Sequence, residues 1–213
     1  MRKVRVSGFS LSVDGFGAGP NQGAGDPLGA HGMELHQWLF GTKSFHAMTG
    51  QSDGSEGVDD KYAARSLTGY GAVIMGRNMF GPIRGEWLDG SWKGWWGENP
   101  PFHTPVFVLT HYRRAPIVMD GGTVFHFITD GIQNALEQAK TMAGDRDIQI
   151  GGGVATVRQF LQAGLIDELH FAIVPVVLGR GEVMFTGIDL AALDFRVMEC
   201  AQGELAMHVV LSN

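Results

Sequence analysis

The stretch Asp147-Ile-Gln-Ile-Gly-Gly-Gly-Val-Ala-Thr-Val157 reads as a buried strand, a turn of three glycines and the start of a helix. Its two isoleucines alternate as a strand requires, and Val154, Val157 and Leu161 then recur at helical spacing. Glycines let the backbone come close to a ligand, and the N–H groups at a helix start attract an anion. The stretch therefore predicts either a phosphate site or an ordinary tight turn, and the rest of the sequence must decide between them.

The composition is that of one globular domain. The chain has 213 residues, of which 44% are apolar and 18% charged, and its net charge is −6. This charge argues against a general nucleic-acid binder, which needs a basic face. No apolar run approaches the roughly 20 residues that cross a bilayer, and the N-terminus leads into a strand pattern instead of a signal peptide. We therefore expect a single domain over 1–213, located in the cytoplasm, with neither a membrane nor a nucleic-acid partner.

Cysteine and histidine usage argues against a metal site. Cys200 is the only cysteine, which excludes an intrachain disulfide and a multi-cysteine zinc site. The eight histidines are scattered, and none forms a His-Glu-x-x-His run. We predict no metal, and we interpret Cys200 as a buried apolar residue of a strand, not as a nucleophile.

Strand-like and helical segments alternate along the chain. The strand-like segments are 3–11, 72–76, 106–110, 124–128, 147–150, 168–177, 194–201 and 205–212. The clearest helices are 131–143, where Asp130 can cap the first turn, and 154–164. This alternation predicts an α/β fold with a largely parallel sheet. The short Gln202-Gly203 connection predicts that the last two strands form an antiparallel hairpin.

Two segments lack this pattern. Residues 12–58 form an extended glycine-rich loop with one expected helix around 33–47, and such long loops are usually lids or binding loops. Residues 86–105 carry four of the five tryptophans. These rings either pack on the core, form a subunit contact or line a substrate pocket.

Three turns that follow strands carry polar or glycine residues. They are Met75-Gly-Arg-Asn78, Leu109-Thr-His-Tyr-Arg113 and Ile150-Gly-Gly-Gly-Val154. In an open parallel sheet, ligands bind at the carboxyl ends of the strands, so all three turns can meet at one edge. Together they predict a dinucleotide site.

The side chains of these turns favour a phosphate-rich cofactor. Arg77 and Arg113 have planar guanidinium groups that suit phosphate, and Thr110 and His111 add a hydroxyl and an imidazole. Two arginines and a hydroxyl suit the additional ribose phosphate of NADP better than the free hydroxyl of NAD. The glycine turn is not a Rossmann fingerprint, and the absence of a Gly-Lys-Ser or Gly-Lys-Thr ending excludes a P-loop.

The chain resembles a known superfamily in the order and spacing of its motifs. The segments Ile74-Met-Gly-Arg-Asn-Met-Phe80, Val106-Phe-Val-Leu-Thr-His111 and Ile150-Gly-Gly-Gly153 resemble the dihydrofolate reductase superfamily. Three further segments resemble most closely the branch that contains the C-terminal reductase domain of riboflavin biosynthesis. They are Ser10-Leu-Ser-Val-Asp-Gly15, Ala163-Gly-Leu-Ile-Asp-Glu-Leu169 and Ile173-Val-Pro-Val-Val-Leu-Gly-Arg-Gly181.

The resemblance implies a dihydrofolate reductase-like three-layer α/β/α fold with an eight-stranded, mixed and mostly parallel sheet. It also implies bound NADPH and hydride transfer to a C=N or C=O group of a small pterin- or pyrimidine-like substrate. Related domains often form homodimers, and the hairpin and the tryptophan-rich loop could supply such a contact. The alternative is a non-catalytic nucleotide-binding or interaction protein on the same fold.

The resemblance also implies roles for individual residues. Gly76 and Arg77 would contact the phosphates of the cofactor, and Thr110 and His111 would contact its adenosine-ribose phosphate. The pyrophosphate would be bound by Gly152, Gly153, Val154 and Ala155. We add Arg113 on physical grounds. Dihydrofolate reductases have a threonine where Met79 stands, so one hydroxyl contact to phosphate is missing here.

Reduction by hydride also requires a proton, and two aspartates are candidates for its source. Asp60 lies at a helix start, about as far before the Met-Gly-Arg motif as the pocket carboxylate of dihydrofolate reductases, but an aspartate there is ordinarily a cap. Asp14 follows the first strand, beside the expected nicotinamide loop, but Val-Asp-Gly is also a common turn sequence. Both assignments, and an ordered water near a carboxylate, stay open.

Overall fold

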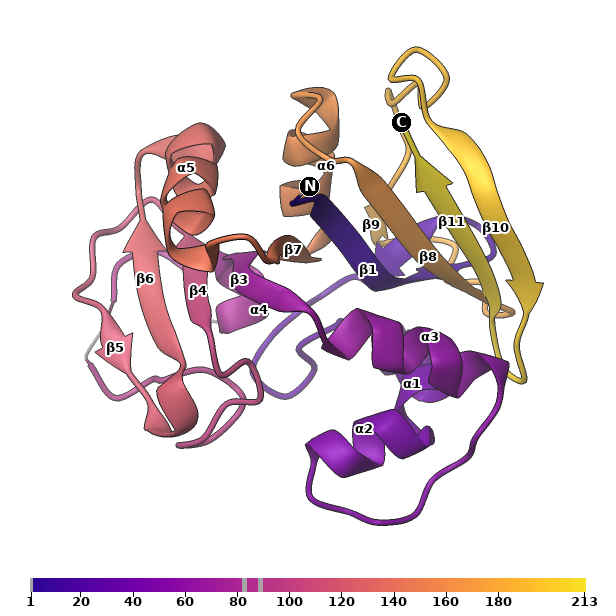
Figure 1. Ribbon diagram of the computed structural model, residues 1–213, viewed down its shortest axis with the longest axis horizontal. Helices are drawn as coiled ribbons and strands as arrows, with labels where there is room; N and C mark the ends of the chain where they lie inside the picture. Colours follow the sequence, from indigo (N-terminus) through magenta and orange to yellow (C-terminus); the bar gives the residue numbers. More distant parts are fainter. Residues whose placement is uncertain (1, 82–83, 88–89) are drawn as a thin grey trace.

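The structure is a computed structural model that describes residues 2–81, 84–87 and 90–213. A large mixed sheet has helices on both of its faces (Figure 1). The strands of this sheet are β1 (Val4–Ser12), β3 (Tyr70–Gly76), β4 (Pro105–Leu109), β5 (Ile117–Val118), β6 (Val124–Ile128), β7 (Asp147–Gly152), β8 (Glu168–Val174), β10 (Arg196–Gln202) and β11 (Met207–Ser212). A second, small sheet pairs β2 (Phe16–Ala18) with β9 (Glu182–Val183).

The large sheet is mostly parallel, as predicted. In the described residues its strand order is β10-β11-β8-β1-β7-β3-β4-β6-β5. The strands from β8 to β6 run parallel to one another, whereas β11 and β10 form the predicted antiparallel hairpin beside β8. We expected eight strands, and the described sheet has nine. One strand that we did not expect is β5, a two-residue segment that pairs antiparallel with β6 at the edge.

Eight helical segments connect the described strands. They are η1 (Gly32–His36), α1 (Gln37–Phe40), α2 (Lys43–Met48), α3 (Val58–Leu67), α4 (Arg77–Phe80), η2 (Asp120–Gly122), α5 (Gly131–Ala143) and α6 (Val154–Gln162). Figure 1 shows α5 and α6 on one side of the sheet and α1, α2 and α3 on the other. The predicted helices 131–143 and 154–164 are therefore confirmed, the second ending two residues early.

The single helix expected around 33–47 was wrong. The chain there forms η1, α1 and α2, because α1 ends at Gly41 and Thr42 takes an extended conformation. The hydroxyl of Thr42 then accepts a hydrogen bond from Phe45 N at 3.3 Å and caps α2. The capping role expected for Asp130 was also wrong: this residue is the N-cap of α5 but makes no side-chain cap, and its Oδ1 accepts from the Thr129 hydroxyl instead.

The two faces of β3 explain why the sheet needs cover on both sides. Ala72 and Ile74 belong to the core cluster beneath α5 and α6, whereas Val73 and Met75 belong to a separate cluster on the opposite face. All four are buried. A parallel strand that is buried on both faces is apolar at every position, instead of alternating.

The tryptophan-rich loop covers the second face of β3. Trp87, Trp92 and Trp96 pack against the cluster that contains Val73 and Met75, and Trp92 Nε1 donates to Phe80 O at 3.0 Å. The packing role is therefore confirmed for the described part of this loop. Residues 88 and 89 lie outside the described residues.

The burial predicted for Cys200 was wrong. Cys200 is exposed, as is every residue of β10 except Ala201. The cause is the place of β10 at the edge of the sheet, where it pairs with β11 alone. The sequence pattern correctly predicted the strand. It could not show that no helix covers the residues of this strand, which are exposed.

A buried chain of hydrogen bonds links the hairpin to β1. Gly8 N donates to His170 Nδ1 at 3.0 Å, so the proton of a neutral His170 lies on Nε2. That Nε2 donates to His208 Nδ1 at 3.0 Å, and His208 Nε2 donates to Asp59 Oδ1 at 2.8 Å. All three side chains are buried, and the Tyr62 ring stacks on His208 with centroids 4.3 Å apart. The network satisfies its members when both histidines are neutral.

The start of α3 is tied to the same hairpin. The carboxylate of Glu204 accepts from Val58 N at 3.1 Å and from Asp59 N at 2.9 Å, and Asp59 Oδ2 accepts from Leu205 N at 2.8 Å. Helix and hairpin thus cap each other, because each supplies a carboxylate to N–H groups of the other. Among the described helices, none is long and apolar enough to span a membrane.

The buried histidines should make the stability depend on pH. Burial, with smaller contributions from His208 and Arg65, lowers the pKa of His170 to about 3, and burial lowers the pKa of His208 below its usual value. The unfolded chain therefore binds protons that the folded chain excludes. The stabilisation from His170 is complete above about pH 6.5 and decreases as the pH falls towards 3, by up to about 1.4 kcal/mol per pH unit, and His208 changes the stability in the same direction.

Urea unfolding of the unmodified chain and of His170→Asn between pH 7 and 5 tests this expectation. Asparagine keeps an acceptor for Gly8 N but removes the titrating ring, so the dependence of the unfolding free energy on pH should become shallower. The control is His31→Asn, at an exposed residue with φ of 61°, a conformation that asparagine tolerates. Equal slopes in the unmodified chain and His170→Asn would contradict the assignment.

Candidate active-site cavity

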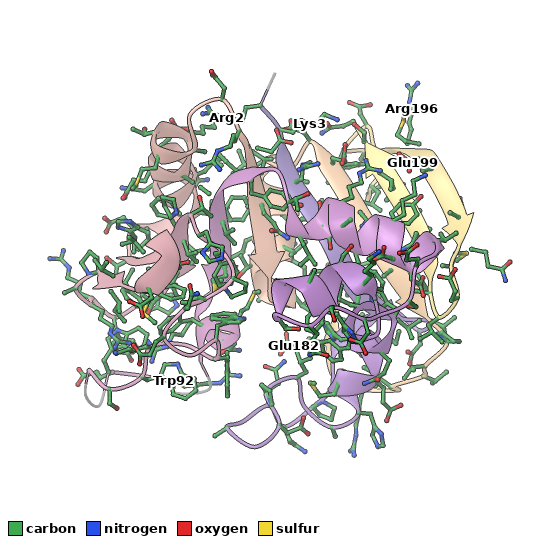
Figure 2. The ribbon with its side chains drawn as sticks, turned by 60° about the horizontal axis from the view of Figure 1, so that its bottom comes forward. Arg2, Lys3, Trp92, Glu182, Arg196 and Glu199 are labelled. Carbon is green, nitrogen blue, oxygen red and sulfur yellow. The ribbon has the colours of Figure 1, made fainter. Side chains whose placement is uncertain are left out.

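A cavity of about 760 Å³ opens at the carboxyl edge of the parallel strands. Residues that follow β3, β4, β6 and β7 line it, together with parts of β1, β2, η1 and α1. Figure 2 shows Glu182 of β9 at this edge, whereas Arg2 and Lys3, before β1, lie at the opposite edge. Small-molecule pockets commonly measure roughly 300–1,000 Å³, so this cavity has the size of a ligand site.

The glycine turn after β7 forms one wall of the cavity. Gly151, Gly152 and Gly153 all line it, and α6 begins at Val154. Gly152 has φ of 127°, which side chains rarely allow, and the Gly152–Gly153 peptide bond is cis. A Cβ added at Gly153 would have no neighbour within 4 Å, so the space in front of the turn is open. The first N–H groups of a helix lack intrahelical partners, and they suit an anion. The glycine turn and the start of α6, residues 151–155, are called the glycine cradle below.

The end of β3 lies directly against this turn. A Cβ at Gly76 would overlap the hydroxyl of Thr156 on α6, so the close approach of β3 and α6 requires glycine. Met79 of α4 also lines the cavity, with Sδ 3.6 Å from the position of a Cβ at Gly152. A thioether therefore covers the turn where the resemblance leads one to look for a threonine hydroxyl.

Arg77 is held in the cavity wall by an aromatic ring. Its guanidinium carbon lies 3.0 Å from the ring centroid of Trp87, and Arg114 lies 4.5 Å from the same ring. Burial, and then the charge of Arg114, lowers the pKa of Arg77 to about 10. The side chain is still positive at neutral pH, and Arg77 lines the same cavity as the glycine turn.

The turn after β4 contributes Thr110 and His111, and both line the cavity. Thr110 is buried, its N donates to Ile128 O at 3.0 Å, and its hydroxyl oxygen accepts from Tyr112 N at 3.2 Å. Arg113 is exposed and does not line the cavity. The structure thus brings together every predicted cofactor residue except Arg113: the chain turns away from the cavity after Tyr112.

Neither predicted proton donor lines the cavity. Asp60 Oδ1 accepts from Ser44 N at 2.7 Å and joins α3 to α2. Asp14 lies in the exposed turn after β1 and accepts from Leu178 N at 3.2 Å and from Gly179 N at 2.7 Å. A hydrogen bond from Ser12, followed by those two N–H groups, lowers the pKa of Asp14. Both carboxylates therefore have structural contacts, and their assignment as proton donors gains no support from their positions.

The structure adds cavity residues that the sequence pattern did not identify. They are Ser10, His36, Glu182, Trp95 and Trp96. Ser10 belongs to the motif that suggested the resemblance, and the two tryptophans belong to the loop that we considered as a pocket wall. His36 lies in the glycine-rich loop 12–58, which we expected to be a lid or binding loop, but no motif singled it out. Glu182 had no such signal, because β9 approaches the cavity only through its pairing with β2.

Comparison with known proteins gives matches in sequence. The model of the family described as the RibD C-terminal domain matches residues 5–209. The uncharacterized protein YyaP of Bacillus subtilis (strain 168) is 37% identical over 146 residues, covering 64% of this chain and 72% of YyaP. The uncharacterized protein YwjB of the same organism is 26% identical over 166 residues, covering 72% of this chain and 84% of YwjB.

Solved structures share the fold. A putative riboflavin biosynthesis protein from Shewanella sp. PV-4 has a TM-score of 0.55 and 18% identity, covering 100% of this chain and 98% of its own. RibD from Acinetobacter baumannii has a TM-score of 0.56 and 21% identity, but this chain covers only 58% of it. A Thermotoga maritima deaminase/reductase, with a TM-score of 0.54 and 13% identity, is covered over 56% of its length. These neighbours confirm the predicted dihydrofolate reductase-like fold.

The two glycines of the cavity should respond differently to the same substitution. We expect Gly76→Ala to lower the free energy of unfolding by about 1–3 kcal/mol, because the added methyl group forces β3 away from Thr156. Gly153→Ala adds its methyl group to open space at φ of −75° and should change stability by less than about 1 kcal/mol. Urea denaturation measures both. A Gly76→Ala chain as stable as the unmodified one would show that the packing at this edge is looser than described.

Proposed function

The chain belongs to the RibD C-terminal domain family, and from this premise we propose that it is an NADPH-dependent reductase. The proposed reaction adds a hydride to the carbon of a C=N or C=O group in a small heterocyclic substrate. The family and the fold support a reductase-like protein. The cofactor and the substrate are the proposed steps beyond that.

One observation carries the proposal. The turns after β7, β3 and β4, three strands that are neighbours in the sheet, line one cavity at their carboxyl ends. They bring a glycine cradle at a helix start, the positive charge of Arg77 and the side chains of Thr110 and His111 to the same wall. Backbone N–H groups, a guanidinium and a hydroxyl are donors that suit phosphate oxygens. The open space at Gly153 gives room for a phosphate group.

The residues of the chain then have separate tasks. Gly152, Gly153, Val154 and Ala155 would hold the pyrophosphate through backbone N–H groups. Gly76 would admit it by lacking a side chain, and Arg77 would offset the charge of the cofactor's phosphates, chiefly that of the ribose phosphate. Thr110 and His111 would contact the ribose phosphate. Bound NADPH would supply the hydride. Trp95, Trp96 and Met79 line the cavity and would exclude water from the reacting carbon.

The source of the proton is proposed from the cavity itself. Glu182 is the one acidic residue among the described cavity residues, and it is exposed. It lies at the mouth, where the small sheet of β2 and β9 meets Arg84. We propose that a water molecule ordered at this mouth delivers the proton. Asp60 and Asp14, the donors that the sequence suggested, lie outside the cavity, and their substitution below tests them as alternatives to this water.

The proposed substrate class is taken from a protein of similar structure. The Thermotoga maritima protein is described as a diaminohydroxyphosphoribosylaminopyrimidine deaminase and 5-amino-6-(5-phosphoribosylamino)uracil reductase. A pyrimidine- or pterin-like ring is therefore the first class to test. The second candidate is a nucleotide-binding protein without catalysis, and the absence of both predicted aspartates from the cavity wall favours it.

Thermal unfolding with NADPH tests the cofactor. At 100 times the dissociation constant, ligand binding should stabilise the chain by about 2.7 kcal/mol. Gly153→Ala should weaken NADPH at least about tenfold, since its methyl group occupies the space proposed for phosphate. Gly41→Ala is the matched control, because Gly41 also has a negative φ and open space but lies outside the cavity.

These measurements separate the outcomes. If neither NADPH nor NADH raises the melting temperature, the cofactor assignment fails. If NADPH stabilises the chain but its absorbance stays constant with a broad panel of pterins, folates and pyrimidinones, the chain is a binder and not a reductase.

Arg77→Ala tests the phosphate contact. Loss of a charged donor should weaken NADPH by about 10- to 100-fold, and it should weaken NADH much less. Arg113→Ala is the control for charge alone: Arg113 is exposed and outside the cavity, so we expect no change. Fluorescence titration measures all four affinities. Equal weakening of NADPH and NADH by Arg77→Ala would contradict the assigned role.

Asp60→Asn and Asp14→Asn test the predicted proton donors. Asparagine keeps an oxygen acceptor for Ser44 N in the first variant and for the 178–179 backbone in the second, so both chains should fold. From their positions outside the cavity we expect turnover to stay within about twofold of the unmodified chain. A large fall in turnover with unchanged folding would restore that aspartate as the donor.

Association into a homodimer remains part of the proposal. Val197 and Met198 on the edge strand β10, and Leu205 and Met207 beside it, are exposed apolar side chains. A second copy could cover this hairpin through a two-fold contact.

A further inference from the structure

Strand β1 contains a β-bulge opposite β8. The register of the two strands shifts between Val6 and Phe9, so that two residues of β1 lie opposite the single residue His170. One of these two is Gly8, whose φ of 66° glycine adopts without strain. A bulge of this kind adds one unpaired residue to a strand and often lies next to a functional site, where it changes the direction of a side chain. The bulge in β1 therefore needs an explanation.

The bulge decides which face of the sheet Phe9 occupies. Successive residues of a strand point to opposite faces, so one extra residue moves all later side chains to the other face. Val6 before the bulge and Phe9 and Leu11 after it all pack on the core cluster beneath α5 and α6. In a regular strand the odd spacing of Val6 and Phe9 would place them on opposite faces. The next residue, Ser10, lies on the face of α1, where its Oγ accepts from Trp38 Nε1 at 2.9 Å.

Phe9 is thereby brought against the glycine cradle. Its ring lines the cavity. A Cβ added at Gly152 would lie 3.4 Å from Phe9 Cε2, and a Cβ added at Gly17 of β2 would lie 2.8 Å from Phe9 Cε1. The ring also packs edge to face on Phe171 of β8, with centroids 6.3 Å apart. Phe9 thus fills the space between β2 and the turn after β7, and it supports the cradle at Gly152.

The backbone of the bulge is held by a side chain. Gly8 N donates to His170 Nδ1 at 3.0 Å, and His170 is buried. A Cβ added at Gly8 would lie 2.8 Å from Ser66 Cβ, so α3 packs directly on the bulge. A backbone N–H that is withdrawn from water needs an acceptor. The conformation of β1 at this point therefore depends on one lone pair, that of His170 Nδ1.

The rest of the buried network keeps this lone pair available. Asp59 Oδ1 accepts from His208 Nε2 at 2.8 Å, and His208 Nδ1 accepts from His170 Nε2 at 3.0 Å. A neutral imidazole has one N–H group, so this order leaves Nδ1 of His170 as the acceptor. Burial, followed by the charges of His208 and Arg65, lowers the pKa of His170 to about 3, so Nδ1 is not protonated at neutral pH. Helix α3 and the hairpin thus act on β1 through the tautomer of one ring.

We propose that His170 is a positioning residue of the ligand cavity: through the bulge at Gly8 it holds Phe9 against the glycine cradle. His208 and Asp59 set the tautomer that this role requires. His170 does not line the cavity, so it acts on a ligand only through the wall that it positions. In its last step the inference rests on the proposed function, because the cradle is where the phosphate groups of the cofactor would bind.

Two substitutions of His170 separate positioning from stability. Asparagine Oδ1 takes the place of Nδ1 as an acceptor for Gly8 N, whereas leucine has a similar size and no acceptor. Both remove the ring and its bond to His208, so a purely structural role predicts the same affinity in both. We expect His170→Leu to weaken the binding of inorganic pyrophosphate and of NADPH at least about tenfold, and His170→Asn to stay within about threefold of the unmodified chain. Calorimetric titration measures these affinities, and equal weakening in the two variants would overturn the proposal.

Thr123→Val is the matched control. Thr123 is buried, its hydroxyl oxygen accepts from His103 N at 2.9 Å, and it lies outside the cavity. The substitution therefore removes a buried acceptor of a backbone N–H, as His170→Leu does, but far from β1 in the sheet. Both affinities should stay within about twofold. A tenfold loss in this variant would show that destabilisation alone weakens the cradle, and the proposal would then fail.

Phe9→Leu tests the step between the bulge and the cradle. The smaller side chain should weaken pyrophosphate to about the same degree as His170→Leu does. The double variant should bind no more weakly than either single variant, because both substitutions remove the same support. Losses that multiply in the double variant would show that His170 does not act through Phe9.

Two NMR measurements need no ligand. In the unmodified chain, a scalar coupling across the hydrogen bond should connect Gly8 N with His170 Nδ1, and its absence would overturn the proposal whether or not a variant folds. The ring of Phe9 lies close to Gly152, so its ring current shifts the amide signal of Gly152. This signal should move in Phe9→Leu and in His170→Leu but stay in place in His170→Asn. A signal that stays in place in Phe9→Leu would contradict the contact even if His170→Leu does not fold.

The failures of the two proposals can be told apart. If the unmodified chain binds neither pyrophosphate nor NADPH, the cofactor assignment fails, and the Gly152 signal still decides whether His170 positions Phe9. If NADPH binds and His170→Leu binds it as tightly as the unmodified chain, the cofactor assignment stands and the positioning role fails.

Discussion

The close approach of β3 to the β7–α6 turn is the constraint on which the cavity depends. A Cβ at Gly76 would overlap the Thr156 hydroxyl, and φ of 127° at Gly152 is a conformation that side chains rarely adopt. Glycine at these positions lets a helix start, with its N–H groups, lie at the end of the central strands. Because Gly153 faces open space, the same feature that brings the backbones together also leaves room for a ligand.

Two buried histidines connect elements that are far apart in the chain. His170 and His208 form a satisfied chain from Asp59 to Gly8 N, so they fix the hairpin, α3 and β1 relative to one another. Gly8 also lines the cavity, and this chain therefore supports one of the cavity walls. His36 lies in the cavity wall and is only partly buried. Desolvation lowers the pKa of His36 to about 4, so this ring is neutral at pH 7.

Local sequence patterns were sufficient to predict most of the fold. Spacing of apolar residues identified α5 and α6 and the principal strands, because one face of each helix and both faces of the central strands must be buried. The glycine turn and the motifs around Gly76 and Thr110 indicated one ligand edge, since parallel strands carry their carboxyl ends to the same side. Patterns did not predict the break at Gly41 and Thr42 or the exposure of Cys200, because both depend on which neighbouring elements cover the segment.

The sequence by itself determined the α/β class, the mostly parallel sheet and the group of turns that line the cavity, because each follows from local periodicity and chain direction. Only the tertiary structure decided which polar groups face that cavity. Asp14, Asp60 and Arg113 have suitable chemistry but lie outside it, whereas His36, Ser10 and Glu182 lie inside it. The direction of a side chain is set by the packing of its element against others far away in the chain, and no local pattern contains that information.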